Sequence, residues 1–309
     1  MIRKIAITLM TLFGRLWGRF ITVHTRPMYA ADMPYAGTEN SDDAQCAIVI
    51  QGPIRHEKDF TLETVKLYGK HYPAATVILS TWEDENISAF ESLGSEKFKV
   101  IRNKKPSNPG GSNINMQIVS TKAGVDKAVQ MGLKYVLKTR SDQRMYGIDS
   151  LKFLKNMLEC FPVLHCELQF KRIITNNTGT NRSVPHHLAD LFMFGDAADM
   201  QLYWTSDVVT ADFYVEAYLF QQFLKKTGWE IINTNENFMS ALGKRCIIVD
   251  NESVDVYWPK NSPRHVNVLR EYRLRDYLNP AFGMSFKSWL NDAYMPAKKS
   301  LETKQGTSR

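Results

Sequence analysis

Cysteine is scarce in this chain of 309 residues, and the four that occur are far apart: Cys46, Cys160, Cys166 and Cys246. None of them belongs to a Cys-x-x-Cys pair, and no histidine stands at zinc-finger spacing from them. Neither a disulfide framework nor a structural zinc site is therefore indicated, and this usage favours a cytoplasmic protein. We expect the isolated cysteines to be small buried hydrophobic residues.

Two glycine-rich phosphate-binding motifs are also missing. The chain contains no Gly-x-Gly-x-x-Gly and no Gly-x-x-x-x-Gly-Lys-Ser/Thr. The first absence argues against a classical dinucleotide-binding fold, and the second argues against a Walker-type nucleotide hydrolase. Any phosphate that this protein binds must be held by other groups.

Long apolar runs are absent, and acidic residues are absent from the first thirty positions. No apolar run approaches the roughly 20 residues that a spanning helix requires. Residues 1–30 instead thread basic side chains through apolar ones, which predicts an amphipathic segment lying on an anionic membrane surface. A signal peptide is the main alternative, although basic residues interrupt its apolar region, and a disordered leader is another. The basic residues are Arg3, Lys4, Arg15, Arg19 and Arg26.

The composition is that of an ordinary globular protein, with 44% hydrophobic and 23% charged residues. The formal charge of +7 suits nucleic acid, anionic lipid or a phosphorylated substrate, and does not choose among them. We predict one large α/β domain with additions at its ends. The predicted parts are a membrane-associating segment (1–30), a linker (31–45), the catalytic domain (46–262), an aromatic and basic C-terminal extension (263–296) and a disordered tail (297–309).

Buried-strand patterns alternate with helical patterns in the first half of the chain. Such alternation predicts a parallel sheet covered by helices. The second half is less regular, so the expected fold class is α/β, with a mixed, mostly parallel sheet flanked by helices in a single domain. The predicted strands are 47–50, 77–82, 98–101, 135–138, 168–174, 188–194 and 246–249. The predicted helices are 61–71, 87–93, 113–131, 196–204 and 213–226.

Polar residues follow the first two predicted strands directly. Because ligands of open parallel sheets bind beyond the carboxyl ends of the strands, we expect a site there. Gly52 allows the backbone to approach a ligand closely, Gln51 offers an amide, and Arg55 offers a phosphate partner. Thr81 stands at the end of the second strand. The competing interpretation is that the Gly-Pro pair after the first strand is only a turn.

The end of the fourth strand carries the densest charge, with Lys138, Arg140, Asp142 and Arg144. A carboxylate at this position suits a divalent cation that bridges a bound diphosphate. The alternative is that Asp142 caps the following turn while the arginines form surface ion pairs.

Two carboxylates in the second half are candidate general bases. Asp190 stands at the mouth of an apolar stretch, where burial would raise its pKa, although a hydrogen-bonded structural role is an equal alternative. Glu216 is the rival base, or else an acid favoured by the dipole of its helix. The adjacent His186 and His187 point to opposite sides of an extended chain, so we do not expect them to share a metal.

Five segments together resemble the WavE-type lipopolysaccharide-synthesis family, which belongs with the GT-A-like glycosyltransferases. Their order and spacing match over roughly residues 46–250. The resemblance implies an α/β nucleotide-sugar-binding fold and a role in building lipopolysaccharide or capsule. The segments are 48–53, 78–82, 113–121, 137–142 and 183–195.

The asparagine-rich helix start is one of these segments. Asn113, Asn115 and Gln117 are expected to contact a donor phosphate or sugar hydroxyl, because backbone N–H groups point outward at a helix N-terminus. An ordinary helix cap is the alternative for the asparagines. The segment departs from the family pattern at Met116, where the family has an arginine.

A second departure concerns the metal motif Asp-x-Asp of GT-A enzymes, in which Arg140 replaces the first aspartate. We predict that Asp142 and the donor phosphates hold a Mn²⁺ or Mg²⁺ cation. The alternative is that Lys138, Arg140 and Arg144 neutralise the diphosphate without metal, since the arginine fork binds phosphate bidentately.

We therefore predict sugar transfer from a nucleotide-sugar donor to a glycan or lipid-linked acceptor, with Asp190 or else Glu216 as the base. We expect the protein to lie in the cytoplasm on the inner face of a bacterial inner membrane, and no nucleic acid as partner. A nucleotidyltransferase that makes the activated sugar is one alternative, although its usual glycine-rich loop is missing. A nucleic-acid-binding protein is another, suggested by arginines among aromatic residues after 264, but it leaves the polar strand ends unexplained.

Overall fold

The computed structural model describes residues 2–18, 25–37, 41–209, 214–259 and 283–306. Its centre is a seven-stranded sheet in the order β3-β2-β1-β4-β7-β6-β8. Only β7 runs antiparallel to its neighbours, so the predicted mixed, mostly parallel sheet in a single domain is confirmed. The strands are β1 (Cys46–Gln51), β2 (Thr76–Trp82), β3 (Phe98–Asn103), β4 (Tyr135–Arg140), β6 (Ile173–Asn176), β7 (Met193–Asp196) and β8 (Cys246–Val249).

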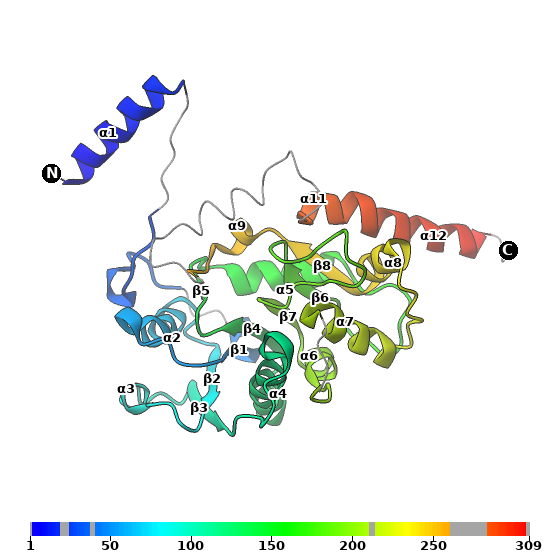
Figure 1. The fold of residues 1–309 in the computed structure, drawn as a ribbon, viewed down its shortest axis with the longest axis horizontal. Helices are drawn as coiled ribbons and strands as arrows, with labels where there is room; N and C mark the ends of the chain where they lie inside the picture. Colours follow the sequence, from blue (N-terminus) through cyan, green and yellow to red (C-terminus); the bar gives the residue numbers. More distant parts are fainter. Residues whose placement is uncertain (1, 19–24, 38–40, 210–213, 260–282, 307–309) are drawn as a thin grey trace.

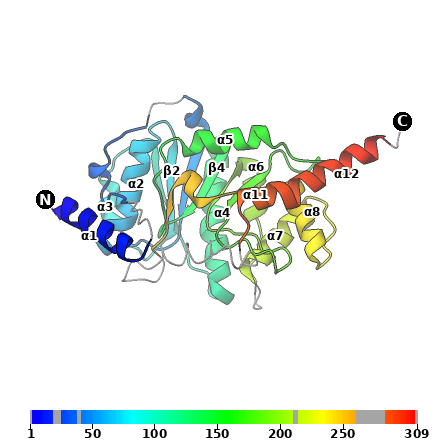
Figure 2. The ribbon, with the colours of Figure 1, turned by 90° about the horizontal axis from the view of Figure 1, so that it is seen from above.

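Helices cover both faces of this sheet, which is why its central strands are continuous apolar runs. Figures 1 and 2 show α2 (Phe60–His71) and α5 (Ser150–Cys160) on one side and α4 (Ile114–Gln130) on the other. α6 (Ala197–Trp204) packs against α4, and α7 (Val215–Lys226) packs against α6. The approach of α4 to β1 requires a glycine, because a Cβ on Gly124 would lie 2.3 Å from Cγ1 of Val49.

The C-terminal residues complete the core. α8 (Asn235–Arg245) packs against a π-helical stretch, η5 (Leu290–Tyr294), which joins α11 (Phe286–Trp289) to α12 (Met295–Gly306). Trp289 is wholly buried, with its ring centroid 5.2 Å from that of Phe161. The predicted disordered tail at 297–309 is therefore corrected as far as Gly306, where α12 ends. The predicted extension at 263–296 lies outside the described residues up to 282.

Two predicted strands are displaced. Residues 168–172 are not in a strand, because the Asp199 carboxylate accepts hydrogen bonds from the backbone N–H groups of Phe170 and Lys171, and the strand begins only at Ile173. Residues 188–192 are also outside the sheet, which they join only at Met193. Thr175 donates to the carbonyls of Ala189 and Phe192, so these groups are satisfied without a strand partner.

The remaining elements are short. β5 (Arg144–Met145) and β9 (Val256–Tyr257) form an antiparallel ribbon, which brings a distant part of the chain beside the end of β4. The short helices are η1 (Ala30–Asp32), η2 (Ser41–Gln45), η3 (Glu57–Asp59), α3 (Ser88–Glu91), η4 (Gly111–Asn113) and α9 (Asn251–Val254).

Residues 25–33, which we call the neck, are tied to the domain by buried side chains. The Arg144 guanidinium donates to the carbonyls of Met28 at 2.6 Å and Phe60 at 2.9 Å. Glu63 accepts from the backbone N–H of Ala30 at 2.8 Å. Lys70 donates to the carbonyl of Met33 at 2.6 Å, so the start of the predicted linker at 31–45 is bound to α2.

Ahead of the neck, α1 (Ile2–Leu16) lies apart from the sheet in Figure 1. Apolar residues recur in it at helical spacing, and the side chains of those described are exposed. Among the residues that the structure describes, no helix is both long enough and apolar enough to span a membrane. The exposed apolar residues include Ile5, Leu9, Leu12, Phe13 and Leu16.

We expect Arg144→Met to lower the free energy of unfolding by about 3 kcal/mol, because it leaves buried carbonyl groups without donors. Urea denaturation of the full chain measures this. Arg182→Met is the matched control, since the half-exposed pair of Arg182 and Asp292 contributes at most about 1 kcal/mol. Equal losses in the two variants would contradict the structural role of Arg144.

Candidate active site

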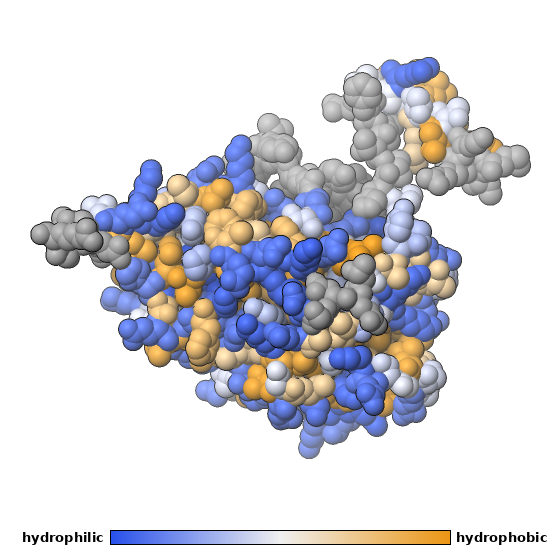
Figure 3. All heavy atoms as spheres, turned by 180° about the vertical axis from the view of Figure 1, so that it is seen from behind, coloured by the Kyte–Doolittle hydropathy of each residue, from blue (hydrophilic) through white to orange (hydrophobic). Residues whose placement is uncertain are grey.

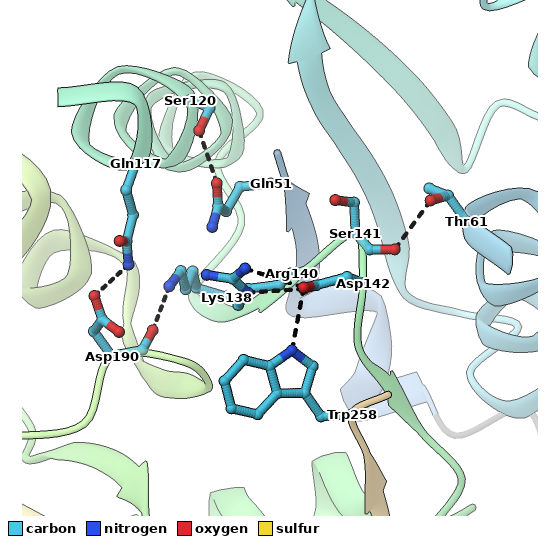
Figure 4. A network of polar contacts seen from close by, with 10 residues as sticks. All are labelled: Gln51, Thr61, Gln117, Ser120, Lys138, Arg140, Ser141, Asp142, Asp190 and Trp258. Atoms are coloured by element: carbon cyan, nitrogen blue, oxygen red, sulfur yellow. Dashed lines mark hydrogen bonds and ion pairs between the residues drawn. The ribbon is translucent and has the colours of Figure 1, made fainter. Parts of the chain in front are cut away.

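A polar pocket of about 660 Å³ lies beyond the carboxyl ends of β1, β2 and β4, beside the start of α4. The ladder brings these ends together, because Gln51 pairs with Ser80 on one side and Arg140 on the other. Figure 4 shows several of the residues involved. The lining consists of Gln51, Gly52, Pro53, Ile54, Arg55, Trp82, Lys105, Ser112, Asn113, Met116, Gln117, Arg140, Ser141 and Asp142.

Seven residues expected in the site line this pocket. They come from the last residues of β1 and β4, from the loops that follow these strands and from the start of α4, the place where the strand-end argument puts a ligand. They are Gln51, Gly52, Arg55, Asn113, Gln117, Arg140 and Asp142.

Four predicted donor-binding residues lie elsewhere. Thr81 is wholly buried and does not line the pocket, whereas the next residue, Trp82, does, because successive strand residues face opposite sides. Asn115 exchanges hydrogen bonds with the backbone of Val209 and so joins α4 to the loop after α6. Arg144 is occupied by the neck, and Lys138 is buried below the pocket.

Lys138 has an unusual environment for a cation. It is wholly buried, its ammonium lies 4.7 Å from the ring centroid of Trp204, and it donates to the backbone carbonyl of Asp190. Burial lowers the pKa of Lys138 from 10.5 to about 8, although the nearby Asp190 carboxylate partly opposes this shift. The side chain therefore supports the loop that carries Asp190.

Neither candidate base lines the pocket. Asp190 is only 3% exposed, and its carboxylate accepts a hydrogen bond from Gln117, which does line the pocket. Glu216 lies in the first turn of α7, with a carboxylate oxygen 3.7 Å from Nε2 of His187.

A buried chain of polar groups orients Gln51. Asn103 donates to Ser80 at 2.9 Å, and Ser80 donates to the carbonyl of Ser120 at 2.6 Å. The Ser120 hydroxyl lies 2.8 Å from Oε1 of Gln51 and 2.8 Å from the carbonyl of Met116, and these two acceptors share its proton. With Oε1 occupied, the amide Nε2 is the donor that Gln51 offers to a ligand.

Thr61 joins two of the loops that form the pocket. Its hydroxyl donates to the carbonyl of Ser141 at 3.0 Å and accepts from the backbone N–H of Arg55 at 2.8 Å. Between these loops Gly52 has φ +113°, and a Cβ there would lie 3.0 Å from the Ser141 hydroxyl. The positive φ favours glycine here, and a Cβ would also crowd the Ser141 hydroxyl.

The entry to α4 is strained where it meets the pocket. Ser112 and Asn113 have φ values of 50° and 63°, in the left-handed region. Each such residue costs about 1–3 kcal/mol, and residues of this kind cluster at functional sites. Both line the pocket and place the N-terminus of α4 against it.

Arg140, Asp142 and Trp258 form one hydrogen-bonded unit at the edge of the pocket (Figure 4). Arg140 donates from Nε to Oδ1 of Asp142 at 2.8 Å and from Nη2 to Oδ2 at 3.1 Å. Nε1 of Trp258 donates to Oδ2 at 3.1 Å, and the Arg140 guanidinium carbon lies 5.6 Å from the tryptophan ring centroid. Sequence reasoning missed Trp258, because it arrives through the β5–β9 ribbon, which has no sequence signature.

The pocket offers one carboxylate to the predicted divalent cation. Asp142 is the single carboxylate among its lining residues, and both of its oxygens accept hydrogen bonds. Across the described ranges, no three His, Cys, Asp or Glu residues are grouped so that they could hold a metal. Because Mg²⁺ is commonly held by one or two carboxylates together with substrate phosphates and water, Asp142 is the lining residue that would hold it.

The family comparison agrees with this fold and site. The model of the family described as WavE lipopolysaccharide synthesis matches residues 46–255, which contain the sheet and every residue of the pocket. The chain belongs to this family. Its membership assigns the protein to lipopolysaccharide synthesis, as the resemblance implied. No curated protein matches the chain.

Solved structures resemble the chain only distantly. A 4-diphosphocytidyl-2C-methyl-D-erythritol synthase shares 10% identity, over 73% of this chain and 97% of its own, with a TM-score of 0.43. The corresponding synthase from Anaerococcus prevotii shares 12%, over 74% and 97%, with a TM-score of 0.40. The mannose-1-phosphate geranyltransferase from Thermus thermophilus shares 10%, over 67% and 74%, with a TM-score of 0.34. At this level of similarity, nothing about the reaction of this protein follows from these structures.

The lowered pKa of Lys138 predicts a pH-dependent stability. Between about pH 8 and 10.5 the unfolded chain binds more protons at this lysine than the folded chain, so stability rises with pH. Raising the pH from about 8 to about 10 should stabilise the wild type relative to Lys138→Met by roughly 2 kcal/mol. Urea denaturation of both proteins at the two pH values measures this, and a difference that does not change with pH would contradict the assignment.

Proposed function

We propose that this protein is a glycosyltransferase that moves a sugar from a nucleotide-sugar donor to a glycan or lipid-linked acceptor, in the synthesis of lipopolysaccharide with its O-antigen, or of capsule. The main support for the proposal is the net positive charge of the pocket, in a chain that belongs to this family. Three cationic side chains, Arg55, Lys105 and Arg140, line it against one carboxylate, Asp142. This excess suits the diphosphate of a sugar donor.

The other lining groups suit the rest of a donor. Gln51 offers an oriented amide N–H, and Ser112 and Asn113 offer hydroxyl and amide groups at the strained entry of α4. Trp82 supplies an aromatic wall. Nucleotide sites are built in this way, with apolar and aromatic surface and a few placed polar groups.

The reaction is displacement at the anomeric carbon of the donor sugar. The bond from this carbon to the diphosphate oxygen breaks, and the electron pair leaves with the nucleoside diphosphate. The acceptor oxygen forms the new bond, and its proton passes to a carboxylate base. Asp190 is one candidate because its partner Gln117 lines the pocket, and Glu216 is the other, with His187 as its neighbour.

We further propose that α1 holds the enzyme on the cytoplasmic face of the bacterial inner membrane, where lipid-linked acceptors are available. Figure 3 shows apolar side chains on α1, at the upper right. Apolar residues recur along one side of the helix, and residues 1–30 contain five basic residues and no acid. Each basic residue near an anionic surface contributes about 1 kcal/mol, in addition to burial of the apolar side.

Donor binding and turnover test the proposed reaction. One class of nucleoside-diphosphate sugar, among UDP, GDP and dTDP sugars, should raise the melting temperature of the wild type, because a ligand that binds only the folded state stabilises it. Gln51→Leu should lose most of that rise, whereas Thr205→Val, at a distant surface position, should keep it. Absence of a shift with every sugar nucleotide would contradict the proposal.

The same donor, labelled in the sugar, is then incubated with membranes that contain lipid-linked glycans. Transfer of label with release of nucleoside diphosphate supports glycosyl transfer. A reaction that consumes a sugar phosphate and a nucleoside triphosphate and releases pyrophosphate would instead support the nucleotidyltransferase alternative. The base is identified as whichever of Asp190→Asn and Glu216→Gln retains donor binding and loses transfer.

Removing residues 1–24 should release the protein from vesicles that contain anionic lipid, because it removes the apolar and basic side chains of α1 and leaves the neck in place. Co-sedimentation with anionic and with neutral vesicles measures this. The full chain should bind the anionic vesicles preferentially, and Phe13→Ser with Leu16→Ser should weaken binding without a change of charge. Equal sedimentation of the full and shortened chains would refute the assignment.

A further inference from the structure

The Asp142 carboxylate is held by Arg140 and Trp258. Both of its oxygens accept hydrogen bonds from Arg140, and one also accepts from Trp258. Its side chain is 21% exposed and that of Arg140 is 25% exposed, so the pair is partly shielded from solvent. A cation bound to Asp142 would lie beside the positive charge of Arg140, on a carboxylate that already accepts three hydrogen bonds.

Arg140 is correspondingly well placed to act as the anion-binding group. Nε and Nη2 face Asp142, and the indole of Trp258 lies against the guanidinium. The Nη1 group takes no part in these hydrogen bonds, and the residue lines the pocket. Although burial opposes it, the hydrogen bonds and charge of Asp142 raise the pKa of Arg140, so the guanidinium stays charged.

Two further cations of the pocket have partners that are easily exchanged. Lys105 pairs with Asp84, whose side chain is 65% exposed, and Arg55 pairs with Glu57, which is 64% exposed. Exposed ion pairs of this kind contribute little to stability. A diphosphate can therefore replace Asp84 and Glu57 at small cost, whereas the shielded pair of Arg140 and Asp142 remains intact.

We infer that Asp142 is a positioning residue for Arg140, and that Arg140 with Lys105 holds the donor diphosphate without a divalent cation. The inference rests on the proposed function, because it concerns the donor of that same site. Asp142 fixes one edge of the guanidinium and leaves the other edge to the phosphate. Trp258, which is far from Arg140 in the sequence, fixes the plane of the guanidinium with its ring. The departing nucleoside diphosphate is neutralised by side chains that are already in place.

The test is the affinity of UDP, GDP and dTDP, and of the matching monophosphates, measured by calorimetry in EDTA and in Mg²⁺ or Mn²⁺. The affinity of the tightest-binding nucleoside diphosphate should differ by no more than about threefold among EDTA, Mg²⁺ and Mn²⁺. This diphosphate should also bind more tightly than its monophosphate. Arg140→Gln should weaken the diphosphate by about 30-fold or more and remove its preference over the monophosphate. Arg102→Gln, which removes an exposed arginine from the end of β3 outside the pocket, is the matched control and should change neither.

Asp142→Asn separates positioning from metal binding. Asparagine still accepts a hydrogen bond from Arg140, so the diphosphate should bind within about tenfold of the wild type in EDTA. Trp258→Phe should have a similarly small effect. Arg140→Lys keeps the charge without the fork and should give an intermediate loss, which preserves the test if Arg140→Gln fails to fold.

The outcomes distinguish this inference from the proposed function. Diphosphate binding that falls more than about tenfold in EDTA and returns with Mn²⁺ would overturn the inference and leave the glycosyltransferase proposal standing. The same holds if Asp142→Asn abolishes binding while Arg140→Gln retains it. Absence of nucleotide binding in every condition would overturn both.

Discussion

The parallel ladder between β1 and β4 places Gln51 beside Arg140, and the pocket depends on this register. A slip of one residue would turn every side chain of a strand to the opposite face of the sheet. If β4 slipped in this way, the side chain of Arg140 would leave the pocket. The buried side chains of Lys138 and Thr139 would also exchange faces. Close packing prevents the slip, because Gly124 of α4 lies against Val49 of β1 with no room for a further carbon atom.

Several buried side chains hold the ligand-binding groups, which this register brings together, in a fixed arrangement. The chain from Asn103 through Ser80 and Ser120 holds the amide of Gln51, and Thr61 joins the loops after β1 and β4. None of these groups needs to move when a ligand enters, so the site is organised before binding. Arg144 extends the same rigidity to the neck, which carries the N-terminal helix.

The sheet and the position of the site were predictable because their signals are local. Continuous apolar runs at 47–50 and 77–82 define buried strands, and polar residues directly after them mark the ligand edge. The same reasoning overlooked α5, although Leu151, Leu154 and Leu158 recur at helical spacing. The tail at 297–309 was misjudged because its composition is polar, yet α12 extends through it as far as Gly306.

The direction of individual side chains was less predictable, because it depends on tertiary contacts. Neither the turn of Thr81 away from the pocket nor the burial of Lys138 under Trp204 follows from the order of residues. Trp258 reaches Asp142 only because β9 pairs with β5, across more than one hundred positions of the chain. The metal role of Asp142 was predicted from a motif, whereas the hydrogen bonds that Arg140 donates to its carboxylate depend on the fold.

We infer that a nucleoside diphosphate binds beside Arg140 at the carboxyl edge of β1 and β4. A crystal structure with the tightest-binding nucleoside diphosphate, grown in the presence of Mn²⁺, tests it most directly, because anomalous scattering locates manganese. We expect phosphate oxygens within hydrogen-bond distance of Arg140, with Asp142 still paired to it and no manganese at the site. A nucleotide bound elsewhere, or manganese ligated by Asp142, would contradict it.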